Sequence, residues 1–254
     1  MAGRLEGKVC VVTGASGGIG AATVGELSRR GWAVVVNYSR SREQAEEVRK
    51  LCPDSLAVQA DVGDDAQCRT LAGAALDKWG RIDALVNNAG TTKFVKHADL
   101  DGLSADDFLR IYRLNVVGPF QMARACAPAL KESRGAVVNV SSVAGLLGTG
   151  SSIAYAASKA ALNSLTFSLA RVLGPEVRVN AVSPGYVDTP WQHKAHGSER
   201  ARQAAERYAG FVPLKDHSRP EDVADAIAWL VEGARQTTGD ILYIDGGMHI
   251  ATPR

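Results

Sequence analysis

The stretch Val9-Cys10-Val11-Val12-Thr13-Gly14-Ala15-Ser16-Gly17-Gly18-Ile19-Gly20 gives the strongest indication of how this chain folds. Four apolar residues, typical of a buried strand, run into a glycine-rich turn, and a helical pattern follows from Gly20 to Arg30. Glycines permit a tight turn and let backbone N–H groups approach a pyrophosphate at the positive end of a helix. The stretch therefore predicts a dinucleotide-binding unit, although its glycine spacing differs from the usual Gly-x-Gly-x-x-Gly.

Apolar runs and helical patterns alternate along the rest of the chain. Further strands are expected at 33–36, 56–59, 84–86, 136–140, 177–182 and 241–244, and further helices at about 43–51, 64–79, 104–131, 152–173 and 220–232. The strands are mostly apolar without alternation, as expected for a parallel sheet covered on both faces. The sequence predicts an α/β fold: a single doubly wound, Rossmann-type domain over residues 1–254, with a seven-stranded parallel sheet and helices on both faces.

The segment from about 186 to 217 interrupts this alternation. It is polar and irregular in pattern, and it contains Pro190, Gly197, Gly210 and Pro213. A long insertion near the C-terminal edge of a sheet is commonly a lid, so we expect a substrate-loop insertion here. The alternative is a pair of surface helices with no role in binding.

Composition narrows the class of protein. Hydrophobic residues make up 46% of the 254 residues, and the formal net charge of +2 gives no reason to expect nucleic acid or a membrane as partner. The four cysteines lack Cys-x-x-Cys spacing and are expected to be reduced thiols. No apolar signal region or membrane-spanning run is visible, so the cytoplasm is the expected location. The five histidines form no strong metal motif, no metal is expected, and His193 and His196 are expected to be solvated.

The end of the second expected strand bears on the choice between NAD and NADP. An acidic residue there binds the ribose hydroxyls of NAD, but the segment Val36-Asn37-Tyr38-Ser39-Arg40-Ser41-Arg42 carries no carboxylate. Ser39, Arg40 and Arg42 could hydrogen-bond a 2′-phosphate, or the arginines could lie on the solvent face of the following helix. The missing acid favours NADP(H), with NAD(H) as the other option.

Two further strand ends carry candidate cofactor contacts. Asp61-Val62 follows the third strand, where a carboxylate could accept a hydrogen bond from an adenine amino group. Asn87-Asn88-Ala89-Gly90 ends the fourth strand. Its small residues suit close approach to a ribose, and its asparagines could equally brace the sheet.

Tyr155 and Lys159 are the most informative pair for chemistry. They lie four apart in a helical stretch, so their side chains share one face. A nearby cation lowers the pKa of a tyrosine from about 10, which would allow proton transfer near neutral pH. A packed ring beside a solvated amine is the alternative. Ser142, beyond the fifth strand, is a second donor for a substrate oxygen or else a turn cap.

Taken in order, these motifs resemble the classical short-chain dehydrogenases/reductases. The resemblance rests on Thr-Gly-x-x-x-Gly-x-Gly at 13–20, Asn-Asn-Ala-Gly at 87–90, Ser142, Tyr-x-x-x-Lys at 155–159 and Pro184-Gly185, and it covers nearly the whole chain. It implies that Tyr155 is the general acid or base, that Lys159 lowers the tyrosine pKa and holds the nicotinamide ribose, and that Ser142 holds the substrate oxygen. Asn115 matches the helix asparagine that positions a proton-relay water, and Thr189, with Val187 nearby, would touch the nicotinamide amide.

The resemblance also defines the expected cofactor contacts and activity. The expected contacts are Gly14, Ser16, Gly17, Gly18, Ile19, Gly20, Tyr38, Ser39, Arg40, Asp61, Val62, Asn88, Ala89, Gly90, Tyr155, Lys159, Pro184, Gly185, Val187 and Thr189. Gly17 departs from some NADP-using relatives, which carry a basic residue there. The implied activity is NADP(H)-preferring hydride transfer between nicotinamide and a carbonyl or secondary alcohol, with 3-oxoacyl-(acyl-carrier-protein) reductases as the nearest-looking branch.

Other functions and the oligomeric state stay open at this point. Sugar and small-alcohol dehydrogenases share every motif, and a non-catalytic dinucleotide-binding sensor is the alternative from another class. The family implies a homotetramer or homodimer. A helix face of small and apolar residues would suit such packing, or would belong to the core only: Ala156, Ala160, Leu162, Leu165 and Leu169.

Overall fold

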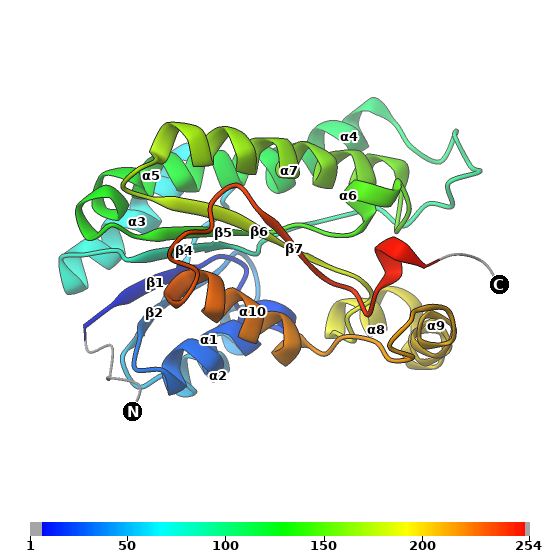
Figure 1. Ribbon diagram of the computed structural model, residues 1–254, viewed down its shortest axis with the longest axis horizontal. Coiled ribbons are helices and arrows are strands. Elements are labelled where there is room, and N and C mark those ends of the chain that lie inside the picture. Colours follow the sequence, from blue (N-terminus) through cyan, green and yellow to red (C-terminus); the bar gives the residue numbers. More distant parts are fainter. Residues whose placement is uncertain (1–6, 252–254) are drawn as a thin grey trace.

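The computed structural model describes residues 7–251, apart from the side chains of residues 194–196, and it is built on a parallel sheet (Figure 1). The strands are β1 (Val9–Val12), β2 (Ala33–Tyr38), β3 (Ser55–Gln59), β4 (Ala84–Asn87), β5 (Ala136–Val140), β6 (Arg178–Pro184) and β7 (Ile241–Ile244). Their order is β3-β2-β1-β4-β5-β6-β7, and every neighbouring pair is parallel. The predicted fold class and seven-stranded sheet are confirmed.

The strand order creates the place where a ligand can bind. The chain lays down β1, β2 and β3 in one direction and then returns to the other side of β1 with β4. The loops that follow β1 and β4 therefore diverge to opposite faces, which opens a crevice at the carboxyl ends of these strands. The glycine-rich turn after β1 and the Asn-Asn-Ala-Gly segment after β4 border this crevice.

Helices cover both faces of the sheet (Figure 1). One face carries α1 (Gly18–Arg29), α2 (Arg42–Lys50) and α10 (Pro220–Glu232), and the other carries α3 (Asp65–Trp79), α4 (Ala105–Tyr112), α5 (Gly118–Ser133) and α7 (Ile153–Leu173). Successive strand residues point to opposite faces. Accordingly, Val12 packs in the core with Leu27 of α1, whereas its neighbour Val11 packs with Leu130 of α5. Both cores are apolar, which explains the uninterrupted hydrophobic strands.

The helix expected over residues 104–131 is not uniform. The structure has α4, then the π-helical segment η1 (Arg113–Val117), then α5. The prediction of one regular helix is therefore wrong at η1, where the turn is wider because its hydrogen bonds span five residues instead of four. Such segments are frequent at functional sites.

The segment from 186 to 217 is helical rather than irregular. It contains α8 (Pro190–His196) and α9 (Ser198–Phe211), and a short helix α6 (Ala144–Leu147) follows β5. The hydroxyl of Tyr186 donates to the carbonyl of Ala201 (2.8 Å), and that of Tyr208 donates to the carbonyl of Asp245 (2.6 Å). The polar pattern of 186–217 therefore reflects surface-exposed helices. Hydrogen bonds from two tyrosines attach these helices to the rest of the domain.

The apolar face of α7 lies largely in the core of this chain. Ala156, Leu162 and Leu169 are at most 6% exposed. The packing of these three residues is intramolecular, which is the core role that the sequence left open. Ala160 of the same face is exposed and Leu165 is half-buried. The large apolar side chains that α7 exposes are Phe167 and Val172.

Other expectations concern single side chains and the chain as a whole. The four cysteines are buried free thiols, and burial raises the pKa of Cys68 and Cys126 to about 12. Over residues 7–251, no helix combines the length and apolar character needed to cross a membrane. Residues 1–6, interpreted from the sequence as lacking a signal region, lie outside the described residues.

Candidate active site

A cavity of about 1090 Å³ opens at the carboxyl ends of the strands and brings the predicted site residues together. All predicted cofactor and catalytic residues line it except Gly20 and Asn115. It extends from the segment after β2, across the glycine-rich turn, to Tyr155 and the start of α8. The site therefore draws on segments from both halves of the chain.

Close packing explains the glycines of the turn. Gly14 has φ +61°, and a Cβ there would lie 2.8 Å from the Cα of Ala89. A Cβ on Gly20 would lie 2.6 Å from Nδ2 of Asn88 and 2.7 Å from the carbonyl oxygen of Gly14. Gly20 thus lets α1 approach the turn without lining the cavity itself. A larger residue at Gly14 would push the turn away from Ala89, and one at Gly20 would push α1 away from the turn and from Asn88.

The segment after β4 braces the glycine-rich turn. The hydroxyl oxygen of Thr13 accepts from the N–H groups of Asn88 (3.0 Å) and Ala89 (3.1 Å). Asn88 Nδ2 in turn donates to the carbonyls of Thr13 and Gly14, both at 2.9 Å. The Asn88 amide is therefore engaged in bracing, which is the role that the sequence left open, although the residue also lines the cavity.

Asn37, which the sequence reasoning did not select, fixes the end of β2. Its side chain is buried, its Oδ1 accepts from the N–H of Gly14 (3.1 Å), and its Nδ2 donates to the carbonyl of Ala60 (3.1 Å). The amide thus ties three segments together. The Asn37 amide is therefore engaged within the protein. The exposed side chains that follow it in the cavity lining are Ser39 and Arg40.

The two arginines near this end differ in position. Arg40 lines the cavity, whereas Arg42 begins α2 and lies outside the lining. Asp61 is exposed in the lining, and its Oδ1 accepts from the N–H of Gly63 (2.9 Å). Arg113 donates to the carbonyl of Gly63 (2.9 Å), which adds a second cation to this end of the cavity.

Tyr155 and Lys159 lie on α7, whose first turn is capped by Ser152. The Ser152 Oγ accepts from the N–H of Tyr155 (3.3 Å). The Lys159 ammonium nitrogen donates to the carbonyl of Val140 at the end of β5 (2.7 Å) and lies 5.6 Å from the centre of the Tyr155 ring. Both residues line the cavity, so the helix-face prediction for this pair is confirmed.

The pKa of Tyr155 differs from the expectation. Burial raises the pKa of its phenol to about 12, and a hydrogen bond with Ser142 offsets this only in part. Burial also lowers the pKa of Lys159 to about 8. The expected lowering of the Tyr155 pKa by Lys159 is therefore wrong for the chain by itself: desolvation outweighs the attraction, and the ammonium is directed to Val140.

Ser142 and Ser141 point to different places. Ser142 lines the cavity, hydrogen-bonds to Tyr155 and also accepts from the N–H of Ala144 (3.2 Å), so it combines the two roles considered from the sequence. Ser141 instead donates to Oδ1 of Asn163 on α7 (2.6 Å). Ser141 also borders the cavity, but its hydroxyl is engaged with Asn163, which agrees with the expectation that Ser142 and not Ser141 holds the substrate oxygen.

Asn115 lies in η1, fully buried behind the cavity wall. Its Nδ2 donates to the carbonyl of Thr91 (2.9 Å) and to the hydroxyl of Ser158 (3.0 Å), and its Oδ1 accepts from the N–H of Thr91 (2.8 Å). Ser158 donates to the carbonyl of Tyr155 (2.7 Å). Asn115 therefore connects the loop after β4 to the helix turn that carries Tyr155.

Two aromatic residues complete the wall near Tyr155. The ring centres of Phe94 and Trp191 are 6.0 Å apart, and those of Tyr155 and Trp191 are 6.2 Å apart, both with edge-on geometry. From the sequence, Trp191 was indicated only through the segment 186–217 that contains it. Trp191 follows Thr189-Pro190 directly, and an aromatic residue at the start of a helix beside the cofactor-binding end of β6 is a signal that could have singled it out.

His193 lies at the surface: its side chain is 38% exposed, as expected for a solvated residue, and it is hydrogen-bonded with Oδ1 of Asp188 (2.7 Å). The side chain of His196 lies outside the described residues. Within the described part of the chain, no group of three or more histidine, cysteine or acidic residues is placed to hold a metal ion.

The cavity fits a dinucleotide in both shape and chemistry. At Gly14 and Gly20 the backbone is packed so closely that no side chain intrudes. At the N-terminus of α1, Gly17 makes no side-chain cap, so the first N–H groups of the helix are left for an anion. Both features suit the pyrophosphate of a nicotinamide dinucleotide.

Comparison with known proteins agrees with this geometry. Residues 14–249 match the family model described as Enoyl-(Acyl carrier protein) reductase. The "Granaticin polyketide synthase putative ketoacyl reductase 2" of Streptomyces violaceoruber is 44% identical over 96% of this chain and 97% of its own length. A 3-oxoacyl-(acyl-carrier-protein) reductase of Thermotoga maritima is 37% identical over 97% of this chain and 100% of its own length.

A solved structure extends the likeness to three dimensions. The crystal structure of a "putative short-chain dehydrogenase/reductase" from Burkholderia xenovorans has a TM-score of 0.88 and 43% identity, and it covers 95% of this chain and 98% of its own. Fold, glycine-rich turn and relatives therefore agree: the chain belongs to the short-chain dehydrogenase/reductase family of NAD(P)-dependent oxidoreductases.

Proposed function

We propose that this protein is an NADP(H)-dependent reductase of 3-oxoacyl thioesters and related ketones. The observation that carries the proposal is that Ser142 and Tyr155 both line the cavity beside the buried Lys159, with Ser142 near enough to Tyr155 to lower its pKa. Reduction of a ketone builds negative charge on its oxygen, and two converging donors stabilise that charge. Relatives named as ketoacyl and 3-oxoacyl reductases support the choice of substrate.

Each residue has a distinct part in the proposed mechanism. NADPH held by the glycine-rich turn after β1 would supply the hydride for the carbonyl carbon. Ser142 orients the carbonyl oxygen, and Tyr155 donates its proton to that oxygen as the carbon–oxygen double bond becomes a single bond. A phenol with a pKa of about 12 is protonated at neutral pH and is therefore ready to act as an acid. Lys159 stabilises the phenolate that remains, and Asn115 positions the route by which Tyr155 regains a proton.

The segment from 186 to 217 is proposed as the lid over the substrate. Although it is a helix pair, Trp191, Gln192 and Tyr208 from this segment line the cavity. A lid that excludes water strengthens the interaction of Ser142 and Tyr155 with the carbonyl oxygen.

The substrate is tested by initial rates with NADPH against a 3-oxoacyl thioester, an aldose and a simple aliphatic ketone. We expect the thioester to give the highest kcat/KM. A higher value for the aldose would reject the proposed substrate class and favour a sugar dehydrogenase. Nucleotide binding without turnover of any of the three would favour a dinucleotide sensor.

The preference for NADP(H) is assigned to Arg40, because this guanidinium borders the cavity beyond a strand end that lacks a carboxylate. A charge-assisted hydrogen bond from Arg40 to the 2′-phosphate would strengthen the binding of NADPH but not of NADH. Arg40→Ala should therefore lower the NADPH-to-NADH ratio of kcat/KM about tenfold. Arg42→Ala is the matched control, because Arg42 lies on α2 outside the cavity lining. An equal ratio in the wild type and Arg40→Ala, or NADH preferred by the wild type, would overturn the assignment.

We also propose that the protein assembles as a homotetramer or homodimer. Exposed apolar side chains on α4, α5 and α7, which lie on the same side of the sheet (Figure 1), support an interface there: Leu109, Phe120, Phe167 and Val172. Contact with another subunit would remove these side chains from water.

A further inference from the structure

We infer that Phe94 and Trp191 form an aromatic clamp beside Tyr155 that selects ketones joined to a planar, conjugated ring. The inference rests on the proposed function, since it places such a ketone at the Ser142–Tyr155 pair. It goes further by naming the side chains that would distinguish a flat ring from a saturated one.

The first support is the arrangement of the rings. Phe94 comes from the loop after β4 and Trp191 from the first turn of α8, yet their ring centres lie 6.0 Å apart with planes inclined at 62°. Trp191 also meets Tyr155 edge-on at 6.2 Å. Both clamp residues line the cavity and remain substantially exposed, at 39% for Phe94 and 43% for Trp191. Apolar ring surface is therefore presented next to the proton donor.

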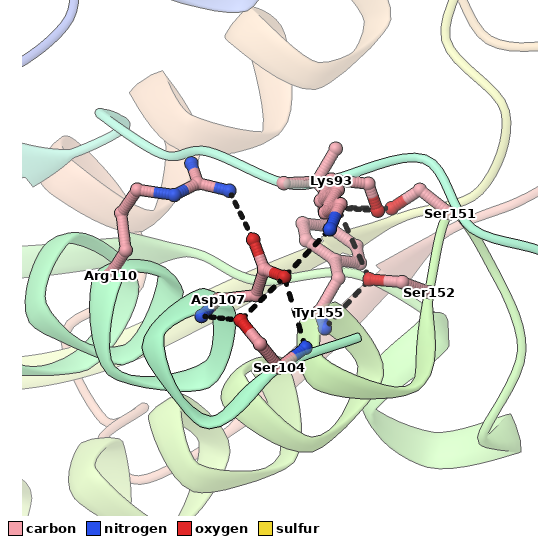
Figure 2. A network of polar contacts seen from close by, with 8 residues as sticks. Lys93, Ser104, Asp107, Arg110, Ser151, Ser152 and Tyr155 are labelled. Carbon is pink, nitrogen blue, oxygen red and sulfur yellow. Dashed lines mark hydrogen bonds and ion pairs between the residues drawn. The ribbon is translucent and has the colours of Figure 1, made fainter. Parts of the chain in front are cut away.

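The second support is the fixed position of the loop that carries Phe94 (Figure 2). The Lys93 ammonium donates to the Asp107 carboxylate on α4 (2.7 Å). On the other side, the hydroxyls of Thr92 and Ser151 are hydrogen-bonded at 2.7 Å, and the N–H of Val95 donates to the carbonyl of Ser151 (2.9 Å). With its neighbours tied to two different segments, Phe94 is held in place before a ligand arrives, so less entropy is lost on binding.

The third support is the small size of the side chains in the adjoining wall. Lys93 is turned to Asp107 and does not line the cavity. The lining segment 149–151, which adjoins the Phe94 loop through Ser151, consists of Thr149, Gly150 and Ser151. Gly150 lies beside the Tyr155 ring, where a Cβ would be 3.8 Å from a ring carbon. Arg110, which also lines the cavity, is turned to Asp107 (3.5 Å). Small, uncharged residues beside Tyr155 therefore leave room for a flat group next to the proton donor.

Edge-on and offset contacts between aromatic rings contribute beyond the burial of apolar area, and a saturated ring of the same size lacks this contribution. The matched substrates are therefore 1-tetralone, whose ketone is conjugated to a benzene ring, and trans-1-decalone, its saturated counterpart. Because conjugation makes the tetralone carbonyl the weaker hydride acceptor, the ratio of kcat/KM for the two ketones in the wild type does not by itself measure the clamp. The clamp is measured by the change in that ratio when one of its rings is removed.

Trp191→Leu and Phe94→Leu should each lower the tetralone-to-decalone ratio about threefold to tenfold. Trp229→Leu is the matched control, because Trp229 is similarly exposed (48%) but lies on α10 outside the cavity lining. It should leave the ratio as in the wild type. A tetralone-to-decalone ratio that both clamp variants preserve would overturn the inference.

A binding experiment separates this inference from the proposed function. Calorimetric titration with 1-naphthol and with 1-decalol, each with saturating NADP⁺, measures recognition of the ring without turnover. Tighter binding of naphthol that is lost in Trp191→Leu supports the clamp even if neither ketone is reduced, in which case the proposed reaction alone fails. Equal wild-type affinities for the two alcohols reject the clamp whatever the rates are, and this arm needs no variant to fold.

Discussion

Replacing Tyr155 by phenylalanine should lower kcat/KM for ketone reduction about a thousandfold, while the affinity for NADPH changes less than about twofold. The substitution removes only the hydroxyl that donates the proton and that hydrogen-bonds with Ser142. The ring, which meets Trp191 edge-on, is retained. Steady-state kinetics gives the first quantity, and fluorescence titration with NADPH gives the second.

Tyr112→Phe is the control for the loss of a phenol hydroxyl. Tyr112 ends α4 and does not line the cavity, so its variant should keep kcat/KM within about twofold of the wild type. If Tyr155→Phe retained wild-type turnover, another group would have to supply the proton, and the mechanism proposed for Tyr155 would be wrong.

Lys159→Met should lower kcat about a hundredfold and raise stability at the same time. The loss of activity follows because no cation remains to stabilise the phenolate form of Tyr155. The gain in stability follows because the wild type buries an ammonium group whose pKa falls from 10.5 to about 8. At neutral pH this shift corresponds to a cost of roughly 3 kcal/mol. Methionine fills similar space without charge but leaves the Val140 carbonyl without its donor, so a net gain of about 1–2 kcal/mol is expected.

The sign of the pH dependence makes this prediction specific. Between about pH 8 and 10.5 the unfolded chain holds a proton on Lys159 that the folded chain has lost, so the contribution of Lys159 to the free energy of unfolding becomes less unfavourable as the pH rises. Below pH 8 both states are protonated and the full cost is present. Buried thiols such as Cys68 and Cys126, whose pKa is raised to about 12, act in the opposite direction but equally in both proteins. Urea unfolding at several pH values should therefore show that the stability advantage of Lys159→Met over the wild type shrinks between pH 8 and 10.5. Lys131→Met, at an exposed lysine of α5, should change stability by less than about 0.5 kcal/mol.

Turnover should respond to the same ionisation. The rate of ketone reduction is expected to be constant below about pH 8 and to fall above it, as Lys159 loses its proton. A reduction rate that increased from pH 7 to 9 would contradict the role given to the ammonium group.

The fold was predictable because its main signals are local. The run Val9–Val12 before a glycine turn, and similar apolar runs before the other helices, indicate strands whose two faces are both buried. Spacing within one helix was equally informative. Tyr155 and Lys159 lie one turn apart, which places both in the cavity.

Long-range contacts account for what the sequence did not reveal. Asn37 serves as a brace because Gly14 and Ala60, far apart in sequence, meet it in space. The pKa of Tyr155 depends on how deeply α7 is buried, which no sequence motif indicates. The effect of Lys159 in lowering this pKa was therefore predicted, but the opposite and larger effect of burial was not. The role of Trp191 depends on the position of α8, which places the Trp191 ring next to that of Phe94.

The segment η1 suggests that the length of this part of the chain is as constrained as its composition. An α-helix advances about 100° per residue, so a single deletion within Arg113–Val117 would turn α4 by that angle relative to α5. Such a deletion would produce a more regular helix and yet rotate Asn115 away from Thr91. In a family alignment, this stretch should therefore tolerate substitutions on its outer side far better than gaps. A relative whose helix is one residue shorter here should lack the hydrogen bonds between Asn115 and Thr91.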